Sequence, residues 1–209
     1  SLRTEIIYLD ASSPTLIKRF SESRRKHPLT TEKIGLRQAI NIETKLLEQI
    51  ALLASLSIDT SSMSLHQLRD TIKTRVVERD DSGLALMFES FGYKYGVPID
   101  ADVVFDVRCL PNPYWEPDLR PLSGLDAPVQ NWLSSQNTVE SMYEDLCQYL
   151  LKWLPKFEEN NRSYMTVAIG CTGGQHRSVY LSERLKRHFA DKIKNVQVMH
   201  RELIRRETA

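Results

Sequence analysis

Residues 171–178 read Cys-Thr-Gly-Gly-Gln-His-Arg-Ser and bring a thiol, a guanidinium and two glycines into one short segment. An apolar run ends at Cys171 and a helix-like stretch begins after Arg177, so the segment should be a loop between a strand and a helix. The first N–H groups of a helix lack partners inside the helix and attract anions. Gly173 and Gly174 let the backbone curl closely around a ligand, and Arg177 can grip a phosphate with two parallel hydrogen bonds. The pattern predicts a phosphate-binding loop.

Three further side chains of this loop favour the same chemistry. Thr172 and Ser178 add hydroxyl groups, and His176 adds a donor that can titrate. The plain alternative is an ordinary strand-to-helix turn with a Gly-Gly kink. Arg, His, Thr and Gly coincide in this short segment, which favours anion binding over that alternative.

The same loop also matches the signature of a cysteine-dependent phosphatase, C-x5-R-[ST], through Cys171, Arg177 and Ser178. In such enzymes a thiolate at a helix N-terminus attacks phosphorus. Gly precedes Cys171 where these phosphatases usually carry His, and the acid that they need would have to be Asp118 or Asp126. The residues alone leave both catalysis and simple phosphate binding open.

Asp106 and Arg108 lie at the end of another strand-like run, just before a proline-rich turn. Strand ends in α/β sheets line ligand crevices. Asp106 could therefore accept hydroxyl groups of a sugar-like ligand while Arg177 holds its phosphate. The alternative is a structural ion pair between Asp106 and either Arg108 or Arg177.

Two basic features point to RNA. Lys94 lies between two tyrosines in the stretch Phe-Gly-Tyr-Lys-Tyr-Gly, a combination that suits a phosphate contact beside a stacked base. Residues 186–209 carry seven basic and three acidic side chains, a charge of +4 in a chain of net charge +1. A basic patch at one end of a slightly acidic body can contact RNA phosphates. The alternative is a solvated terminal helix.

The elements that must hold these residues follow from hydrophobic periodicity. Strands are expected at 5–12, 56–62, 84–92, 101–110, 163–171 and 195–201, and helices at 15–28, 35–55, 65–79, 139–157 and 178–192. This alternation predicts an α/β protein with parallel strands and a domain boundary near residue 82, giving domains 1–82 and 83–209. Residues 111–128 contain five prolines and are expected to form a long ordered loop anchored by Trp115.

Bulk composition narrows the class of protein. The three cysteines, Cys109, Cys147 and Cys171, are far apart in the sequence and favour reduced thiols in a cytoplasmic protein without a metal site. Arg19, Arg24 and Arg25 lie near one helix end, as do the lid arginines of nucleotide kinases. The alternative is a solvated helix face. No glycine of the chain begins a Walker A motif, so the phosphate cradle of a P-loop fold is absent from it.

Longer stretches resemble the RapZ (YvcJ) family of P-loop-containing nucleotide-binding proteins nearly from end to end. They include LDASSPTLIKRFSESRRKHPL, IDTSSMSLHQL, MFESFGYKYGVPIDADVVFDVRCLPNPYW and NNRSYMTVAIGCTGGQHRSVY. The resemblance implies a kinase-like N-terminal domain that binds ATP or GTP, with its Walker A loop upstream of Ser1, and at most weak NTPase activity. It implies a second α/β domain that binds a sugar phosphate and resembles part of phosphofructokinase.

The resemblance also implies a function, partners and site residues. Family members bind a small regulatory RNA and glucosamine-6-phosphate, present the RNA to RNase E, and form homo-oligomers in the cytoplasm. The implied sugar-phosphate contacts are Asp106, Tyr114, Cys171, Thr172, Gly173, Gly174, His176, Arg177 and Ser178. The implied RNA contacts are Lys94, Lys192, Lys194, Arg201, Arg205 and Arg206.

Two positions depart from the pattern of the enterobacterial members of the family. Tyr114 stands where they carry His, which is expected to alter the ligand pocket. Glu207 interrupts a tail that is fully basic in them, which is expected to weaken RNA binding.

Overall fold

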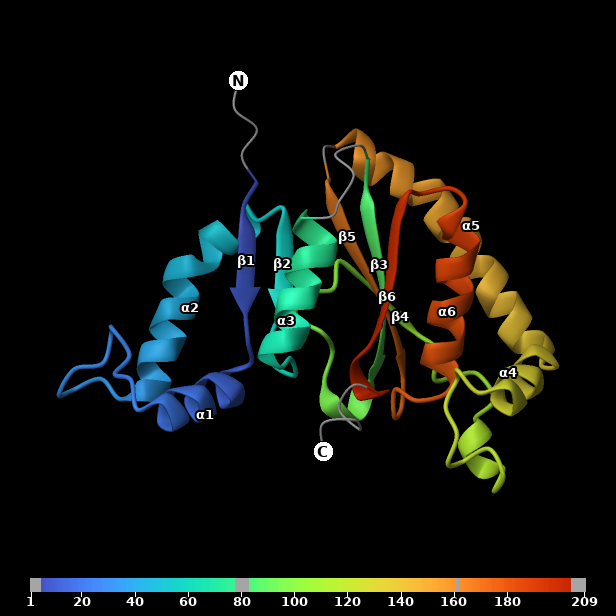
Figure 1. Ribbon diagram of the computed structural model, residues 1–209, viewed down its shortest axis with the longest axis horizontal. Coiled ribbons are helices and arrows are strands. Elements are labelled where there is room, and N and C mark those ends of the chain that lie inside the picture. The colour runs from blue at the N-terminus through green and yellow to red at the C-terminus, as the bar shows by residue number, and fades with distance from the viewer. Residues whose placement is uncertain (1–4, 78–82, 161, 204–209) are drawn as a thin grey trace. The chain divides into compact units, whose positions relative to one another are not determined.

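The computed structural model describes residues 5–77, 83–160 and 162–203. Contacts divide the chain into two compact units, Ser1–Ile72 and Lys73–Ala209, each of which is described by itself. Both units consist of parallel strands connected mainly by helices (Figure 1). The predicted α/β class with parallel strands is confirmed, with a separate parallel sheet in each unit. Within the described ranges, no helix is long and apolar enough to cross a membrane.

The first unit is built on two parallel strands. Strand β1 (Ile7–Asp10) pairs with β2 (Leu56–Asp59), and helices α1 (Ser13–Ser23) and α2 (Leu36–Leu52) connect them. Helix α3 (Leu65–Ile72) follows β2. The connection is long enough for the crossover that parallel strands require.

Helix α1 shows how local chemistry sets an element's bounds. A proline occupies its first turn, where the missing N–H costs nothing. The helix ends at Ser23 because Arg24 adopts a left-handed conformation with a φ of 51°. The predicted helix over 15–28 was therefore too long at its C-terminal end.

The second unit contains a four-stranded parallel sheet in the order β4-β5-β3-β6. Its strands are β3 (Ala85–Gly92), β4 (Val103–Asp106), β5 (Tyr164–Cys171) and β6 (Asn195–His200). Every residue of β3 and β5 is buried, which is typical of central parallel strands covered on both faces. Because the strands are parallel, the residues that follow β3, β4 and β5 all emerge at one edge of the sheet.

Helices α4 (Ala127–Ser134), α5 (Asn137–Glu159) and α6 (Arg177–Ala190) belong to the same unit. Figure 1 shows the three helices gathered on one side of the sheet. Leu150 of α5 and Leu181 of α6 are fully buried in a core that includes Phe88 and Ile169. The apolar face predicted for the 139–157 helix is therefore turned into the core.

The proline-rich segment departs from its prediction in two ways. Residues 127–134 form α4, with a proline in its first turn, so the loop predicted over 111–128 ends two residues earlier and the helix itself was not predicted. Trp115 was expected to anchor this loop, and that prediction is wrong because its side chain is 73% exposed.

Candidate functional site

The 171–178 segment has the predicted strand–loop–helix geometry. Strand β5 ends at Cys171, and α6 begins at Arg177 with His176 as its N-cap. The carbonyl of His176 accepts the first helical hydrogen bond, from the N–H of Tyr180, at 2.9 Å. Gly174 has a φ of 70°, a conformation that L side chains rarely adopt. A glycine is therefore needed at the bend of this loop.

The loop packs directly on the turn that follows β3. A Cβ on Gly174 would lie 2.6 Å from the backbone nitrogen of Gly92 and 2.4 Å from Cγ of Glu202. A Cβ on Gly92 would lie 2.7 Å from the carbonyl carbon of Gly173. These glycines allow two backbones to touch, whereas a Cβ on Gly173 would meet only the side chain of Lys94, at 3.9 Å. One face of the loop is thus open toward Lys94.

Lys94 and the loop are separate motifs in the sequence that the fold brings together. Lys94 lies in the short 3₁₀ helix η2 (Tyr93–Tyr95) after β3, and its N–H donates to the carbonyl of Thr172 at 3.3 Å. Both side chains are exposed. An ammonium, a hydroxyl and an open glycine backbone together form a surface that an anion can reach.

Arg177 is almost fully buried, with an exposed fraction of 4%. Its Nη1 donates to the carbonyls of Arg108 at 2.9 Å and of Leu110 at 2.8 Å, and its Nη2 donates to Thr172 Oγ1 at 3.4 Å. Burial lowers the pKa of the guanidinium. Arg177 thus fastens the segment after β4 to the segment after β5, and its direct contact with a phosphate stays a prediction.

Cys171 is buried to 3% exposure, unlike a nucleophile that must reach a substrate. Its Sγ accepts from the N–H of Gly174 at 3.2 Å and lies 3.2 Å from Ser178 Oγ. Of the two candidate acids, Asp126 accepts from the N–H and hydroxyl of Ser123, and these bonds hold its pKa below the ordinary value. A carboxyl group stabilised as its anion is a poor general acid. The geometry therefore favours binding over phosphatase chemistry.

Asp106 forms the ion pair that the sequence left open as an alternative. Its carboxylate accepts from Arg108 Nε at 3.0 Å and from Nη2 at 2.6 Å, and also from the N–H of Arg108 at 2.9 Å. These hydrogen bonds lower the pKa of Asp106, and the charge of Arg177 contributes in the same direction. The guanidinium of Arg108 lies over the ring of Tyr93, with 3.9 Å to the ring centroid. Asp106 positions Arg108 in this structure, and its contact with a sugar stays a prediction.

Residues 107–126 form a loop that is fastened at both ends to the β5–α6 segment. The N–H of Val107 donates to the carbonyl of Gly170 at 2.9 Å, and the N–H of Gly124 donates to that of Gln175 at 2.8 Å. Tyr114 lies on this loop with its ring exposed and the guanidinium of Arg120 over it, at 4.8 Å from the centroid. His176 is buried, so it does not reach the surface that Thr172 offers.

Besides Lys94, the five other predicted RNA contacts fall into three groups. Lys192 and Lys194 are exposed after α6, as expected of phosphate contacts. Arg201 lies in the interior, where its Nε is 3.6 Å from Glu89 Oε1, and we leave it out of the RNA surface for this reason. Arg205 and Arg206 lie outside the described residues.

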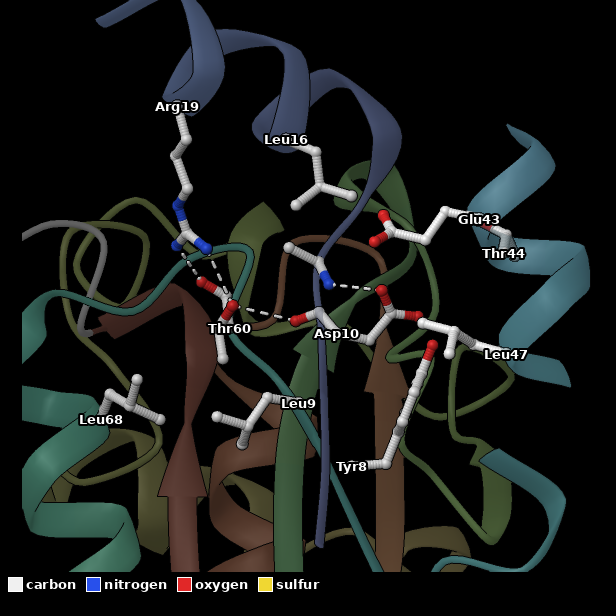
Figure 2. A pocket seen from close by; sticks show the side chains of 11 residues that line it. Tyr8, Leu9, Asp10, Leu16, Arg19, Glu43, Thr44, Leu47, Thr60 and Leu68 are labelled. Carbon is white, nitrogen blue, oxygen red and sulfur yellow. Dashed lines mark hydrogen bonds between the residues drawn. The ribbon is translucent and has the colours of Figure 1, made fainter. Parts of the chain in front are cut away.

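The first unit contains a pocket of about 350 Å³ where β1 and β2 end (Figure 2). Arg19 donates from Nη1 to Thr60 Oγ1 at 2.9 Å and from Nη2 to the Thr60 carbonyl at 2.6 Å. Arg24 and Arg25 are exposed and do not line the pocket. Of the three predicted lid arginines, the structure therefore brings only Arg19 to this pocket.

Sequence reasoning missed several residues of these two sites. Tyr8 and Glu43 line the pocket of the first unit. The pKa of Tyr8 is raised, chiefly by burial and further by the negative charges of Asp10 and Glu43. Gly124 packs against the start of α6, where a Cβ would lie 2.3 Å from the carbonyl oxygen of His176. Gly92 could have been suspected, because it ends a strand directly before the Tyr-Lys-Tyr turn. The other residues carry no local signal.

Both parts of the chain match known domain families. Residues 84–204 match the RapZ C-terminal domain, and residues 1–80 match the RapZ-like N-terminal domain. A nucleotide-binding protein of Pseudomonas putida is 56% identical over 202 residues, which are 97% of this chain and 71% of that protein. Nucleotide-binding proteins of Azotobacter vinelandii and Saccharophagus degradans are each 57% identical over 95% of this chain. The matched residues make up 70% and 68% of those two proteins.

Proposed function

The chain belongs to the RapZ family of nucleotide-binding proteins, and from this premise we propose that it is an RNase adapter. In this role it binds a small regulatory RNA, senses glucosamine-6-phosphate, and guides the RNA to RNase E in the cytoplasm as a homo-oligomer. Amino-sugar synthesis is thereby adjusted to demand. The second unit carries the RNA and sugar-phosphate sites.

One observation carries this proposal: the fold places Lys94 beside the 171–178 loop. The two motifs are far apart in the sequence, yet the N–H of Lys94 bonds to the carbonyl of Thr172 and its side chain lies next to Gly173. The phosphate of the sugar binds Lys94, the hydroxyl of Thr172 and the open backbone at Gly173. The segment that carries Asp106 and Tyr114 then faces the sugar ring.

Calorimetric titration with glucosamine-6-phosphate tests the sugar-phosphate site. Lys94→Met removes an exposed group that the fold does not need, so this variant should fold. Thr172→Val also removes the acceptor of the long hydrogen bond from Arg177 Nη2, at 3.4 Å, so its fold is checked by urea denaturation alongside. A lost charged hydrogen bond lowers affinity by roughly tenfold, which is the loss expected for Lys94→Met. Lys152→Met, on the exposed face of α5, is the matched control and should bind as wild type does. Unchanged affinity of both site variants would contradict the proposed site.

Arg177→Ala is a poorer test of the same site. It removes the guanidinium that holds the carbonyls of Arg108 and Leu110, so a loss of binding would also follow from a displaced loop. The phosphatase alternative has its own assay, turnover of an aryl phosphate by wild type and by Cys171→Ser. Turnover that disappears in the variant would favour catalysis over sensing.

For the first unit, we propose that Arg19 contributes to the nucleotide site of the family. Its support is that Arg19 reaches the ends of both strands through Thr60, whose hydroxyl donates to the carbonyl of Asp10 at 2.9 Å. ATP or GTP is the expected nucleotide. Arg19→Met should weaken nucleotide binding by the full-length protein, while Arg25→Met should have less effect. Equal affinities of the two variants would contradict this role.

A further inference from the structure

The pocket of the first unit has an acidic side as well as an arginine. Tyr8 and Asp10 lie on the same face of strand β1, two residues apart, and Glu43 reaches the pocket from helix α2. Figure 2 shows their polar groups turned toward the same part of the pocket, with Arg19 on its other side. The arginine suits a phosphate, so the acidic side must suit a different part of a nucleotide.

Glu43 is held in place by a buried histidine. The N–H of Leu29 donates to Nδ1 of His27 at 3.1 Å, so Nδ1 is the acceptor of the ring and Nε2 carries the proton. That Nε2 lies 3.1 Å from Oε2 of Glu43 and donates to it. The imidazole is only 1% exposed, whereas the Glu43 side chain is 41% exposed. The carboxylate is therefore both preorganised and accessible to a ligand.

Tyr8 and Asp10 place a hydroxyl donor beside the acidic groups. Oδ1 of Asp10 accepts from the N–H of Ala11 at 2.7 Å, which fixes the orientation of this carboxylate. The pKa of the Tyr8 phenol is raised, first by burial and then by the charges of Asp10 and Glu43. The phenol therefore keeps its proton at neutral pH and can donate a hydrogen bond.

A hydroxyl donor next to a fixed carboxylate is complementary to the hydrogen-bonding edge of guanine, which carries a carbonyl oxygen, a ring N–H and an amino group in sequence. We propose that this pocket binds the base of a guanine nucleotide, with Glu43 accepting from the ring N–H and the amino group and Tyr8 donating to the carbonyl. The inference rests on the proposed nucleotide-binding function of the first unit and adds which base is selected. Adenine presents an unprotonated ring nitrogen in place of the ring N–H, and its lone pair is repelled by a carboxylate.

The remainder of the pocket suits a flat base. Leu16 of α1, Leu47 of α2 and Leu68 of α3 line it, and its volume is about 350 Å³. Apolar walls with a few fixed polar groups are typical of sites for small organic ligands. A metal ion or an isolated sugar diol would not need these apolar surfaces, whereas the two faces of a base do. Arg19 lies apart from Glu43 in Figure 2, as a ligand with a phosphate at one end and a base at the other requires.

Calorimetric titration of the full-length protein with guanosine, inosine and adenosine diphosphates tests the inference. Wild type should bind the guanosine compound at least about tenfold more tightly than the adenosine compound, because a base edge paired with two hydrogen bonds discriminates by that much or more. Inosine diphosphate lacks the amino group and should have an intermediate affinity.

Glu43→Gln removes the acceptor but keeps an amide oxygen for the hydrogen bond from His27, so this variant should fold. Its affinity for guanosine diphosphate should fall roughly tenfold, while that for adenosine diphosphate should not fall. Glu48→Gln is the matched control, since Glu48 is exposed on the same helix and does not line the pocket. It should bind all three nucleotides as wild type does.

The outcomes separate this inference from the function on which it rests. Equal affinities of wild type for the guanosine and adenosine compounds would overturn the choice of base and leave nucleotide binding standing. Binding of none of the three nucleotides by wild type would overturn both. A guanine preference that survives in Glu43→Gln, or an equal loss of both affinities in that variant, would show that Glu43 does not read the base.

Discussion

At the scale of single residues, some side chains of the 171–178 loop can reach a ligand and others hold the loop in place. Thr172 is exposed and can meet a ligand, whereas Cys171 and Arg177 are buried and hold the loop in place. The sequence correctly predicts that this segment is a loop between a strand and a helix. The sequence does not show which of these side chains reach solvent. That depends on the segment after β4, whose carbonyls accept hydrogen bonds from the guanidinium of Arg177.

Gly174 should tolerate no side chain. Its φ of 70° is strained for any L residue, and an added Cβ would meet Gly92 and Glu202 at 2.6 and 2.4 Å. Gly174→Ala is expected to lower the free energy of unfolding by at least about 1–3 kcal/mol. Urea denaturation measures the effect, with Gly173→Ala as the control because an added Cβ there meets only a flexible side chain. Equal stability of the two variants would show that the bend is not constrained as described.

His200 should make stability depend on pH. Its Nδ1 lies 2.9 Å from Ser90 Oγ and its Nε2 lies 3.2 Å from Glu183 Oε1. Burial lowers the pKa of the imidazole, more strongly than Glu183 raises it, and Lys186 adds to the lowering. Below the unfolded value of about 6.5, the unfolded chain therefore binds a proton that the folded chain does not.

This contribution to stability is therefore complete above the unfolded pKa of about 6.5 and is lost as the pH falls from there through the lowered pKa of the folded state. Urea denaturation at about pH 7.5 and about pH 5.5 should show a smaller loss of stability for His200→Gln than for wild type. His66→Gln, at an exposed histidine of α3, should behave as wild type does. A pH dependence that is the same in all three proteins would refute the assignment.

At the scale of elements, strands and helices could be predicted because each has its own local pattern of apolar residues. The buried runs of β3 and β5 and the apolar face of α5 are examples. Boundaries were less accurate: α1 stops at Ser23 because of a left-handed Arg24, and α4 begins in a segment whose prolines suggested only loop. Those outcomes depend on single backbone conformations that composition does not reveal.

Besides their apolar packing in the core, α5 and α6 are joined by the side chain of one arginine. Arg184 of α6 donates from Nη1 and Nη2 to the two carboxylate oxygens of Glu140 in α5, at 2.6 and 3.0 Å. Its guanidinium also lies 3.7 Å from the ring centroid of Tyr143, whose pKa is raised to about 12, chiefly by burial. A lysine keeps the charge but loses the fork and the stacking.

Arg184→Lys is therefore expected to destabilise the second unit by about 1 kcal/mol. Thermal or urea denaturation measures the change, and Arg187→Lys, at an exposed position of the same helix, should have little effect. If the two variants are equally stable, the contact between the helices does not depend on this arginine.

At the scale of the whole molecule, the central feature is that motifs far apart in the sequence meet at one edge of the second sheet. Lys94 follows β3, Arg108 follows β4 and Thr172 follows β5. The sequence predicts each motif by itself. Their proximity could not be predicted from the residues alone, because it depends on the strand order β4-β5-β3-β6, which no local pattern encodes.

This arrangement places the proposed sugar-phosphate site and the proposed RNA surface on shared residues. Lys94 belongs to both, since its side chain lies beside Gly173 and over Tyr95. A phosphate bound at Lys94 would neutralise the charge that an RNA phosphate needs. Sensing of the metabolite and binding of RNA would then be linked through competition for one lysine.

The most direct test of this account is to measure the affinity of the protein for single-stranded RNA with and without saturating glucosamine-6-phosphate, at constant ionic strength. The account predicts that the sugar phosphate weakens RNA binding in wild type and has a smaller effect in Lys94→Met. A chloride salt at the same ionic strength controls for simple screening. RNA affinity that is unchanged at saturating glucosamine-6-phosphate would contradict the claim that one surface serves both ligands.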